Sequence, residues 1–172
     1  MTPYWQLFYH LVWATRGHRP VLTGEVESVI HGYVRDRVRT LGGSAFAVGG
    51  LPDHVHLVAA IPPKIAVSTF IGQVKSGASA RYNRRFPPST PSTRFAWQES
   101  YGVFTFDRKG LFNAIDYVQH QLHHHTQDTV IPILERMEGG APSLIRQPET
   151  DYYIDSDAWR AEMLSLDTEL FE

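Results

Sequence analysis

SAFAVGGLPDHVHLVAA, residues 44–60, is the stretch from which the fold can be worked out. Its apolar ends predict two short strands, at 44–48 and 54–60. Between them, residues 49–53 read Gly-Gly-Leu-Pro-Asp, a composition that favours a turn. We therefore expect two consecutive strands here, the second and third of the chain.

The flanking sequence supplies the other elements of an α+β fold. Residues 4–14 alternate between two faces, as a strand does. Thr23 is suited to cap a helix that Gly42-Gly43 would stop. The other expected elements are a helix at 67–85, a strand at 95–97 and 101–106, and a helix at 108–126. The order βαββαβ predicts a ferredoxin-like (split βαβ) antiparallel sheet with helices on it, followed by one more helix.

The composition is that of a globular protein. With 172 residues and 42% apolar content, the chain can form one domain with a real core. It has no cysteine, which excludes disulfides, thiolate zinc sites and cysteine nucleophiles. Histidine, carboxylate and amide groups remain as metal ligands. The apolar run at 4–13 is too short to span a bilayer and no basic segment precedes it, so we expect no membrane segment.

Charge is divided unevenly along the chain. Residues 1–126 hold 13 Lys/Arg and 7 Asp/Glu, whereas residues 127–172 hold 3 and 11. A basic body with an acidic tail suits a domain that binds a polyanion. An unevenly charged, solvated surface explains the same counts equally well. Within the tail, helical spacing predicts one closing helix with an apolar face of Trp159, Met163, Leu166 and Leu170.

His54 and His56 form the first candidate site. Side chains two apart on a strand share a face, so these two rings converge while Val55 and Leu57 enter the opposite, apolar side. About 7 Å apart along the strand, they can close on one divalent ion. A bare His-x-His pair is more often a pair of surface or hydrogen-bonded histidines. Its place on an apolar strand favours metal binding, because buried imidazoles need partners.

The last expected helix carries the second candidate site. Tyr117, Gln121 and His124 follow one another at i, i+4 and i+7 and form one stripe. The separate core stripe is expected to comprise Leu111, Ile115, Val118 and Leu122. Tyr117 and Gln121 would then point together, away from the core. By itself this pair fits an amphipathic helix whose exposed edge happens to hold a tyrosine and a glutamine.

Taken together, the motifs resemble the single-tyrosine transposases of bacterial insertion sequences, a branch of the HUH (His-hydrophobe-His) nucleases that includes the REP-associated tyrosine transposases. The resemblance runs from about His10 to Gln127. Its carriers are His-Leu-Val-Trp-Ala-Thr (10–15) with Arg19-Pro20, Leu-Pro-Asp-His-Val-His-Leu (51–57), Ile-Gly-Gln-Val-Lys-Ser (71–76), Trp-Gln-Glu-Ser-Tyr-Gly (97–102), and Tyr-Val-Gln-His-Gln (117–121) with His123-His124. Each motif alone is of modest specificity; the order and spacing of the set are specific.

The resemblance implies a transposase that nicks and rejoins single-stranded DNA at hairpin-bearing element ends. Tyr117 would be the nucleophile and form a 5′-phosphotyrosine, and His54, His56 and Gln121 would bind Mg²⁺ or Mn²⁺. Family members work as homodimers, and in several the tyrosine helix completes the partner's active site. We expect a catalytic domain at 1–130 and an acidic extension at 131–172 packed on it. The expected location is the cytoplasm, at the nucleoid when DNA is bound.

Other residues are expected around the site. Asp53 either orients His54 or shapes the turn, and His10 either edges the site or is a satisfied core histidine. His124 would lie at the edge of the site, whereas the neighbouring histidines 120, 123 and 125 are expected to contact solvent or DNA. Phosphate contacts are expected from Arg16, Arg19, Lys75, Arg81, Arg84, Arg85, Arg108 and Lys109. Each of these residues, taken singly, is also typical of a solvated charge on the protein surface.

Two other functions fit parts of the pattern. A non-catalytic ferredoxin-like module would bind nucleic acid and never cleave it. A metal-dependent hydrolase that uses water would cleave without forming a tyrosine-linked product.

Overall fold

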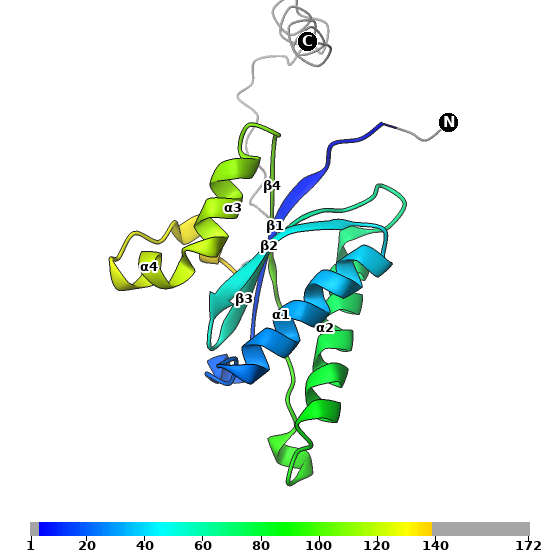
Figure 1. Cartoon of the computed structure of the whole chain (residues 1–172), viewed down its shortest axis with the longest axis vertical. Helices are drawn as coiled ribbons and strands as arrows, with labels where there is room; N and C mark the ends of the chain where they lie inside the picture. The colour runs from blue at the N-terminus through cyan, green and yellow to red at the C-terminus, as the bar shows by residue number, and fades with distance from the viewer. Residues whose placement is uncertain (1–3, 139–172) are drawn as a thin grey trace, which may run out of the picture. The chain divides into compact units, whose positions relative to one another are not determined.

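Four strands form one antiparallel sheet in the order β2-β3-β1-β4 (Figure 1). This computed structural model describes residues 4–138, and residues 1–3 and 139–172 lie outside the described part. The strands are β1 (Phe8–Ala14), β2 (Ser44–Leu51), β3 (His54–Ala60) and β4 (Gly102–Phe106). One α-helix separates β1 from β2 and another separates β3 from β4. The ferredoxin-like α+β prediction is confirmed.

The two faces of the sheet carry different helices. The helices α1 (Glu25–Thr40) and α2 (Val67–Arg85) cover one face, and the main core beneath them includes Leu57 of β3 (Figure 1). The next residue, Val58, belongs to a second cluster on the opposite face, where α3 (Leu111–Gln119) packs. This alternation is the one expected of a strand that is buried on both sides.

The strand register places the histidine pair on the face that α3 covers. His54 pairs with Ala14 of β1, and His56 pairs with Val12. Residues that pair across an antiparallel ladder project to the same face, and so do residues two apart along one strand. His54 and His56 therefore share the face of Val58, which packs against α3. A helix distant in sequence is in this way brought over the His-x-His motif.

The strand boundaries differ from the prediction in three places. β1 begins at Phe8, because Phe8 already pairs with the last residues of both β3 and β4 and earlier residues have no partner strand. β2 continues to Leu51 with a bulge at Phe46, so the connecting turn shrinks to Pro52-Asp53. The segment expected as a strand at 95–97 makes only an isolated bridge at Trp97.

The single helix expected at 108–126 is in fact two helices. After α3, His120 adopts φ −109° and ψ 23°, and α4 (Gln121–Thr126) then begins in a new direction. Leu122, expected in the core, is 67% exposed, whereas Tyr117, expected away from the core, is 3% exposed. Leu111, Ile115 and Val118 pack in the second cluster as predicted. The prediction was wrong for Leu122, because it assumed one uninterrupted helical period through His120. Tyr117 is buried because Glu135 and Ile131 contact its hydroxyl.

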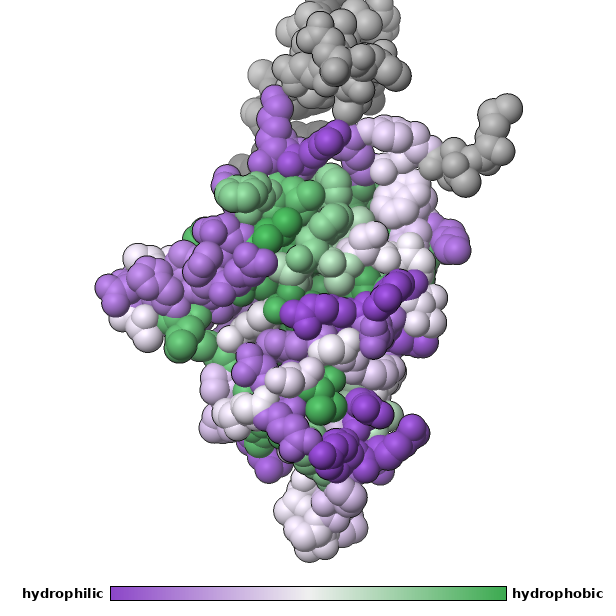
Figure 2. Space-filling view, viewed as in Figure 1, coloured by the Kyte–Doolittle hydropathy of each residue, from purple (hydrophilic) through white to green (hydrophobic). Residues whose placement is uncertain are grey.

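The surface carries apolar as well as polar areas. Figure 2 shows apolar side chains (green) gathered over the sheet near α3. Large exposed apolar side chains of the described residues include Phe112 and Leu122.

Of the described helices, none is long and apolar enough to cross a bilayer. The closing helix predicted from Trp159, Met163, Leu166 and Leu170 lies outside the described residues.

Candidate metal centre and tyrosine nucleophile

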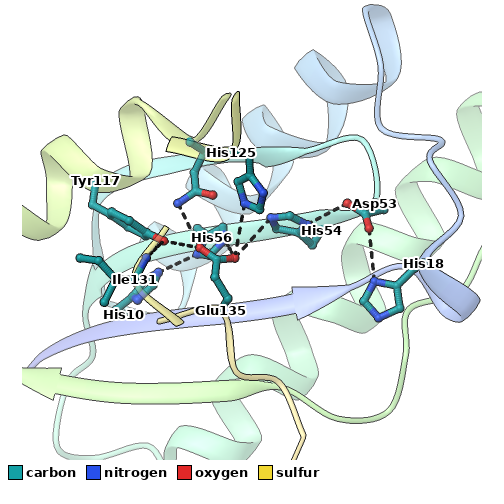
Figure 3. A network of polar contacts seen from close by, with 10 residues as sticks. His10, His18, Asp53, His54, His56, Tyr117, His125, Ile131 and Glu135 are labelled. Atoms are coloured by element: carbon teal, nitrogen blue, oxygen red, sulfur yellow. Dashed lines mark hydrogen bonds and ion pairs between the residues drawn. The ribbon is translucent and has the colours of Figure 1, made fainter. Parts of the chain in front are cut away.

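His54 and His56 are both buried, and their ring centroids lie 5.0 Å apart. Asp53 flanks this pair: its Oδ1 lies 2.8 Å from Nδ1 of His54 and its Oδ2 lies 3.2 Å from Nδ1 of His18 (Figure 3). Burial acts to raise the pKa of Asp53, but the hydrogen bond and charge interaction with His54 and the hydrogen bond with His18 together outweigh it, and the pKa is lowered. A hydrogen bond at Nδ1 fixes the ring and leaves Nε2 as the ligand atom, so Asp53 lies where an orienting residue must lie.

His10 and His56 form a buried stacked pair. Nε2 of His10 lies 2.8 Å from Nδ1 of His56, and the ring centroids are 5.0 Å apart. Burial, with the neighbouring His56 as the second cause, lowers the pKa of His10 to about 3. Burial also lowers the pKa of His56. Both rings are therefore neutral at pH 7, which is the form of imidazole that binds metals. His10 is at once a buried histidine and the edge of the site.

Tyr117 brings its hydroxyl from α3 into the same site. The hydroxyl donates a hydrogen bond to Oε1 of Glu135 and accepts one from the backbone N–H of Ile131 at 3.2 Å. Burial and the bond to Glu135 raise its pKa. The His124 ring stacks on the tyrosine ring with centroids 4.8 Å apart. His124 thus holds the face of Tyr117 and does not reach the histidine pair directly.

Gln121 opens α4 and is 2% exposed. Its Nε2 lies 3.5 Å from Oε1 of Glu135. Its Oε1 is buried with no hydrogen-bond partner among the described residues, and the same is true of Nε2 of His54. Buried polar atoms are normally satisfied, so two such orphans beside one carboxylate indicate a missing partner. A divalent cation fits, because an amide oxygen and an imidazole nitrogen are both electron-pair donors.

Glu135 and His125 complete the site, and neither was predicted to belong to it. Glu135 lies on a 3₁₀ turn, Pro132–Glu135, in the stretch that we assigned to the acidic extension. Nε2 of His125 lies 3.7 Å from Oε2 of Glu135. Ligand atoms of His54, His125 and Glu135 all lie within 4.8 Å of one another. Burial would raise the pKa of Glu135, but hydrogen bonds, from His56 first and also from Tyr117, hold it at about 2.

A family model described as "Transposase IS200 like" matches residues 3–121. The matched span holds both histidines of the His-x-His motif, as well as Tyr117 and Gln121, and it covers well over half of the chain. The chain belongs to the IS200-like transposase family. The resemblance drawn from the sequence motifs is thereby confirmed.

Named relatives support the same assignment for this transposase. It is 30% identical over 120 residues to the ISDra2 transposase TnpA of Deinococcus radiodurans. The aligned region covers 68% of this chain and 85% of the relative. It is also 30% identical over 125 residues to the transposase for insertion sequence element IS200 of Salmonella typhimurium, covering 69% of this chain and 78% of the relative.

Solved structures share the fold of the transposase. A crystal structure of a Deinococcus radiodurans R1 protein assigned as a transposase superposes with a TM-score of 0.57 at 27% identity, covering 70% of this chain and 95% of that one. A REP-associated tyrosine transposase bound to a REP hairpin superposes with a TM-score of 0.53 at 15% identity, covering 73% and 74%. The second likeness is one of fold alone.

Lys75, one of the residues expected to contact DNA, has a structural place in the transposase. Its ammonium donates hydrogen bonds to the carbonyls of Gln98, Glu99 and Ser100, at 2.7, 3.0 and 3.0 Å. The residue is 8% exposed, and burial lowers its pKa to about 8. An ammonium has three N–H donors, and all three are used here to hold the segment before β4.

The other predicted DNA-contacting residues do not form one cluster. Arg16 lines a hollow that Glu135 also lines, so it borders the site. Arg81 and Arg84 line a groove between α1 and α2, on the opposite face of the sheet. The remaining members of the predicted set are Arg19 in the loop after β1, Arg85 in an ion pair with Glu25, and Arg108 and Lys109 just before α3.

Proposed function

We propose that this IS200-like transposase nicks and rejoins single-stranded DNA, with Tyr117 as the nucleophile. The observation that carries the proposal is a shared contact. The Tyr117 hydroxyl and Nε2 of His56 both contact the carboxylate of Glu135, the latter at 3.1 Å (Figure 3). The Glu135 carboxylate thus connects the Tyr117 phenol to a histidine pair that is suited to hold a metal.

The proposed step is a transesterification at one phosphodiester. The oxygen of Tyr117 bonds to phosphorus and the bond from phosphorus to the 3′-oxygen breaks. The phenol releases one proton and the leaving 3′-oxygen takes one up, which gives a 5′-phosphotyrosine and a free 3′-hydroxyl. Because one phosphoester replaces another, attack by a later 3′-hydroxyl reverses the step and joins strands without ATP.

His54, His56 and Gln121 are the residues that we propose to hold a divalent cation, Mg²⁺ or Mn²⁺. When bound there, such an ion polarises the phosphodiester and neutralises the charge that develops during transfer. Asp53 and His10 position the two imidazoles by the hydrogen bonds described above. Tyr117 is an unreactive phenol in the free protein, because its pKa is raised above the ordinary value of about 10.

We propose a hairpin-bearing single strand as the substrate. A structure with this fold, the REP-associated tyrosine transposase, is bound to a REP hairpin. Arg16 is suited to bind a phosphate beside the site, since it lines the hollow that reaches Glu135. We also propose that the protein acts in the cytoplasm and as a homodimer. The exposed Phe112 and Leu122 side chains support an apolar contact between copies.

The test is a covalent adduct on labelled, hairpin-containing single-stranded DNA in the presence of Mn²⁺. Wild type should give a protein–DNA band that survives denaturation. Tyr117→Phe should abolish the band, and His56→Ala should reduce it by at least about a hundredfold. Tyr4→Phe is the matched control, because Tyr4 is 74% exposed and precedes the sheet, and it should behave as wild type.

Other outcomes would support other functions. Cleavage by Tyr117→Phe with no tyrosine-linked product would indicate a hydrolase that activates water. Binding of the hairpin without cleavage at every Mn²⁺ concentration would indicate a non-catalytic binding protein. Melting temperatures of all variants should be measured beside the wild type, so that loss of an adduct is not confused with loss of the fold.

A further inference from the structure

One oxygen of Glu135 faces three imidazole nitrogens. Its Oε2 lies 3.1 Å from Nε2 of His56 and 3.7 Å from Nε2 of both His54 and His125 (Figure 3). Two of the rings come from β3 and the third from α4. Only the contact with His56 is a hydrogen bond. The nitrogens of His54 and His125 therefore face the carboxylate without a hydrogen bond to it.

The spacing of these atoms matches that of atoms bound to one cation. Two donors that each lie about 2.1 Å from an ion are about 3.0–3.4 Å apart, for right-angled or tetrahedral arrangements. The observed separation of 3.1 Å lies within this range, and that of 3.7 Å exceeds it by a few tenths of an ångström. The unpartnered Nε2 of His54 faces the same carboxylate, and the Gln121 amide, whose Oε1 is also unpartnered, approaches it through Nε2. Small shifts of the His54 and Glu135 side chains, with a rotation of the Gln121 amide, would let all of them share an ion.

We propose that Glu135 is itself a protein ligand of the divalent cation, through Oε2, alongside His54 and His56. This inference rests on the metal site of the proposed function and names a further ligand of it. Two neutral imidazoles and an amide are an unusual set for Mg²⁺ or Mn²⁺, which prefer carboxylate oxygen. Glu135 supplies that oxygen and one negative charge, and Nε2 of His125 lies beside it.

Glu135 is held in this place by its own segment. Ile131, earlier in the same segment, donates its backbone N–H to the Tyr117 hydroxyl. Leu134 packs against the second cluster, under α3. On the other side, the carbonyl of Arg136 passes so close to Gly102 that a Cβ there would lie 2.1 Å from it. The absence of a side chain at residue 102 therefore lets the segment cross β4. A carboxylate fixed in this way is pre-positioned to bind an ion at little cost in entropy.

The experiment is a calorimetric titration of the full chain, free of DNA, with Mn²⁺ and separately with Zn²⁺. Glu135→Gln should weaken Mn²⁺ binding by about tenfold or more, and should weaken Zn²⁺ binding less, because Zn²⁺ accepts nitrogen ligands readily. Glu138→Gln is the control: Glu138 carries the same charge nearby but bonds to Gln98, and its removal should leave both affinities unchanged. Glu135→Asp should retain part of the preference for Mn²⁺.

Each other result overturns the inference. Equal Mn²⁺ affinity in Glu135→Gln shows that the carboxylate is not a ligand, and tighter binding shows that it competes with the ion. An equal loss of Mn²⁺ and Zn²⁺ affinity shows a merely structural role. If His56→Ala abolishes Mn²⁺ binding while Glu135→Gln does not, this inference fails and the proposed metal site stands. If wild type binds no Mn²⁺, or if His56→Ala binds it as well as wild type does, the proposed metal site fails as well.

Discussion

The backbone carbonyl of Val118 lies where a side chain at Gly49 would be: a Cβ built on Gly49 would be 2.3 Å from it. Gly49 pairs with His56 across the β2–β3 ladder, and Val118 follows Tyr117 on α3. The close approach of α3 to β2 thus sets the distance between the nucleophile's helix and the histidine strand. The lack of a Cβ at residue 49 is part of the site's construction.

Gly49→Ala should therefore damage both the fold and the site. Because the obstructing atom is backbone, α3 must move away, and we expect a loss of about 1–3 kcal/mol in the free energy of unfolding. Adduct formation should slow by more than the unfolded fraction explains. Gly32→Ala on α1 is the control, since its Cβ meets open space, and it should stabilise by about 0.5–1 kcal/mol. Urea unfolding and the adduct assay check both; unchanged values for Gly49→Ala would show that α3 is not fixed by this contact.

Asp53→Asn should weaken metal binding without unfolding the protein. Asp53 holds Nδ1 of His54, and removal of such an orienting carboxylate typically costs about 10–100-fold in metal affinity. His18→Gln removes the other partner of Asp53 and should leave the affinity within about twofold of wild type. Calorimetric titration with Mn²⁺ distinguishes the two variants. An Asp53→Asn protein that binds Mn²⁺ normally would assign Asp53 to the turn alone.

The sequence was informative wherever a site residue lies in a regular element or a local motif. His54 and His56 share a face because β3 is a strand, and that inference needs no knowledge of distant contacts. The burial of Tyr117 could not be obtained in this way, because it depends on tertiary contacts with Glu135 and Ile131 that no local period reveals. The exposure of Leu122 follows from the break at His120, which no glycine or proline marks.

Glu135 was beyond the reach of the sequence for a different reason. It lies 14 residues after Gln121 in an irregular stretch, so no helical or strand period connects it with the site. Its place is set by tertiary contacts, of which the crossing over Gly102 is one. The acidic composition of the tail even favoured placing it apart from the catalytic domain. Only its proximity to His56 and His125 in the fold reveals it.

Lys75→Met should cost stability, not DNA affinity. The substitution leaves the carbonyls of residues 98–100 without their ammonium, which typically costs about 1–3 kcal/mol. Binding to single-stranded DNA, measured below the melting temperature, should stay within about twofold of wild type. Arg16→Met is the comparison, since Arg16 borders the site, and it should weaken binding and reduce its salt dependence. A Lys75→Met protein of normal stability with weakened binding would restore Lys75 to the DNA-contacting set.

His31 should make the protein sensitive to mild acid. Burial, and secondly Arg35, lower the pKa of His31 to about 4, whereas the unfolded chain titrates near 6.5. Below pH 6.5, His31 takes up a proton in the unfolded state but stays neutral in the folded state until the pH approaches 4. The contribution of neutral His31 to the free energy of unfolding is therefore complete above pH 6.5 and is lost as the pH falls towards 4, by up to about 3 kcal/mol. Urea unfolding at pH 7.5 and 4.5 should show a smaller drop for His31→Gln than for wild type. Parallel drops would exclude His31 as the cause.

Tyr117 and the histidine pair meet within one chain, since the phenol and His56 contact the same Glu135. We therefore expect each chain to use its own tyrosine. The test mixes Tyr117→Phe with His56→Ala protein before hairpin DNA and Mn²⁺ are added. If the site is built in cis, no mixed assembly holds an intact site and no adduct appears. If a partner's helix supplied the tyrosine, a mixed dimer would contain one complete site and recover adduct formation, up to about half of the wild-type yield per dimer. Light scattering on the mixture must show that dimers form and exchange, since only then does a missing adduct exclude the trans arrangement.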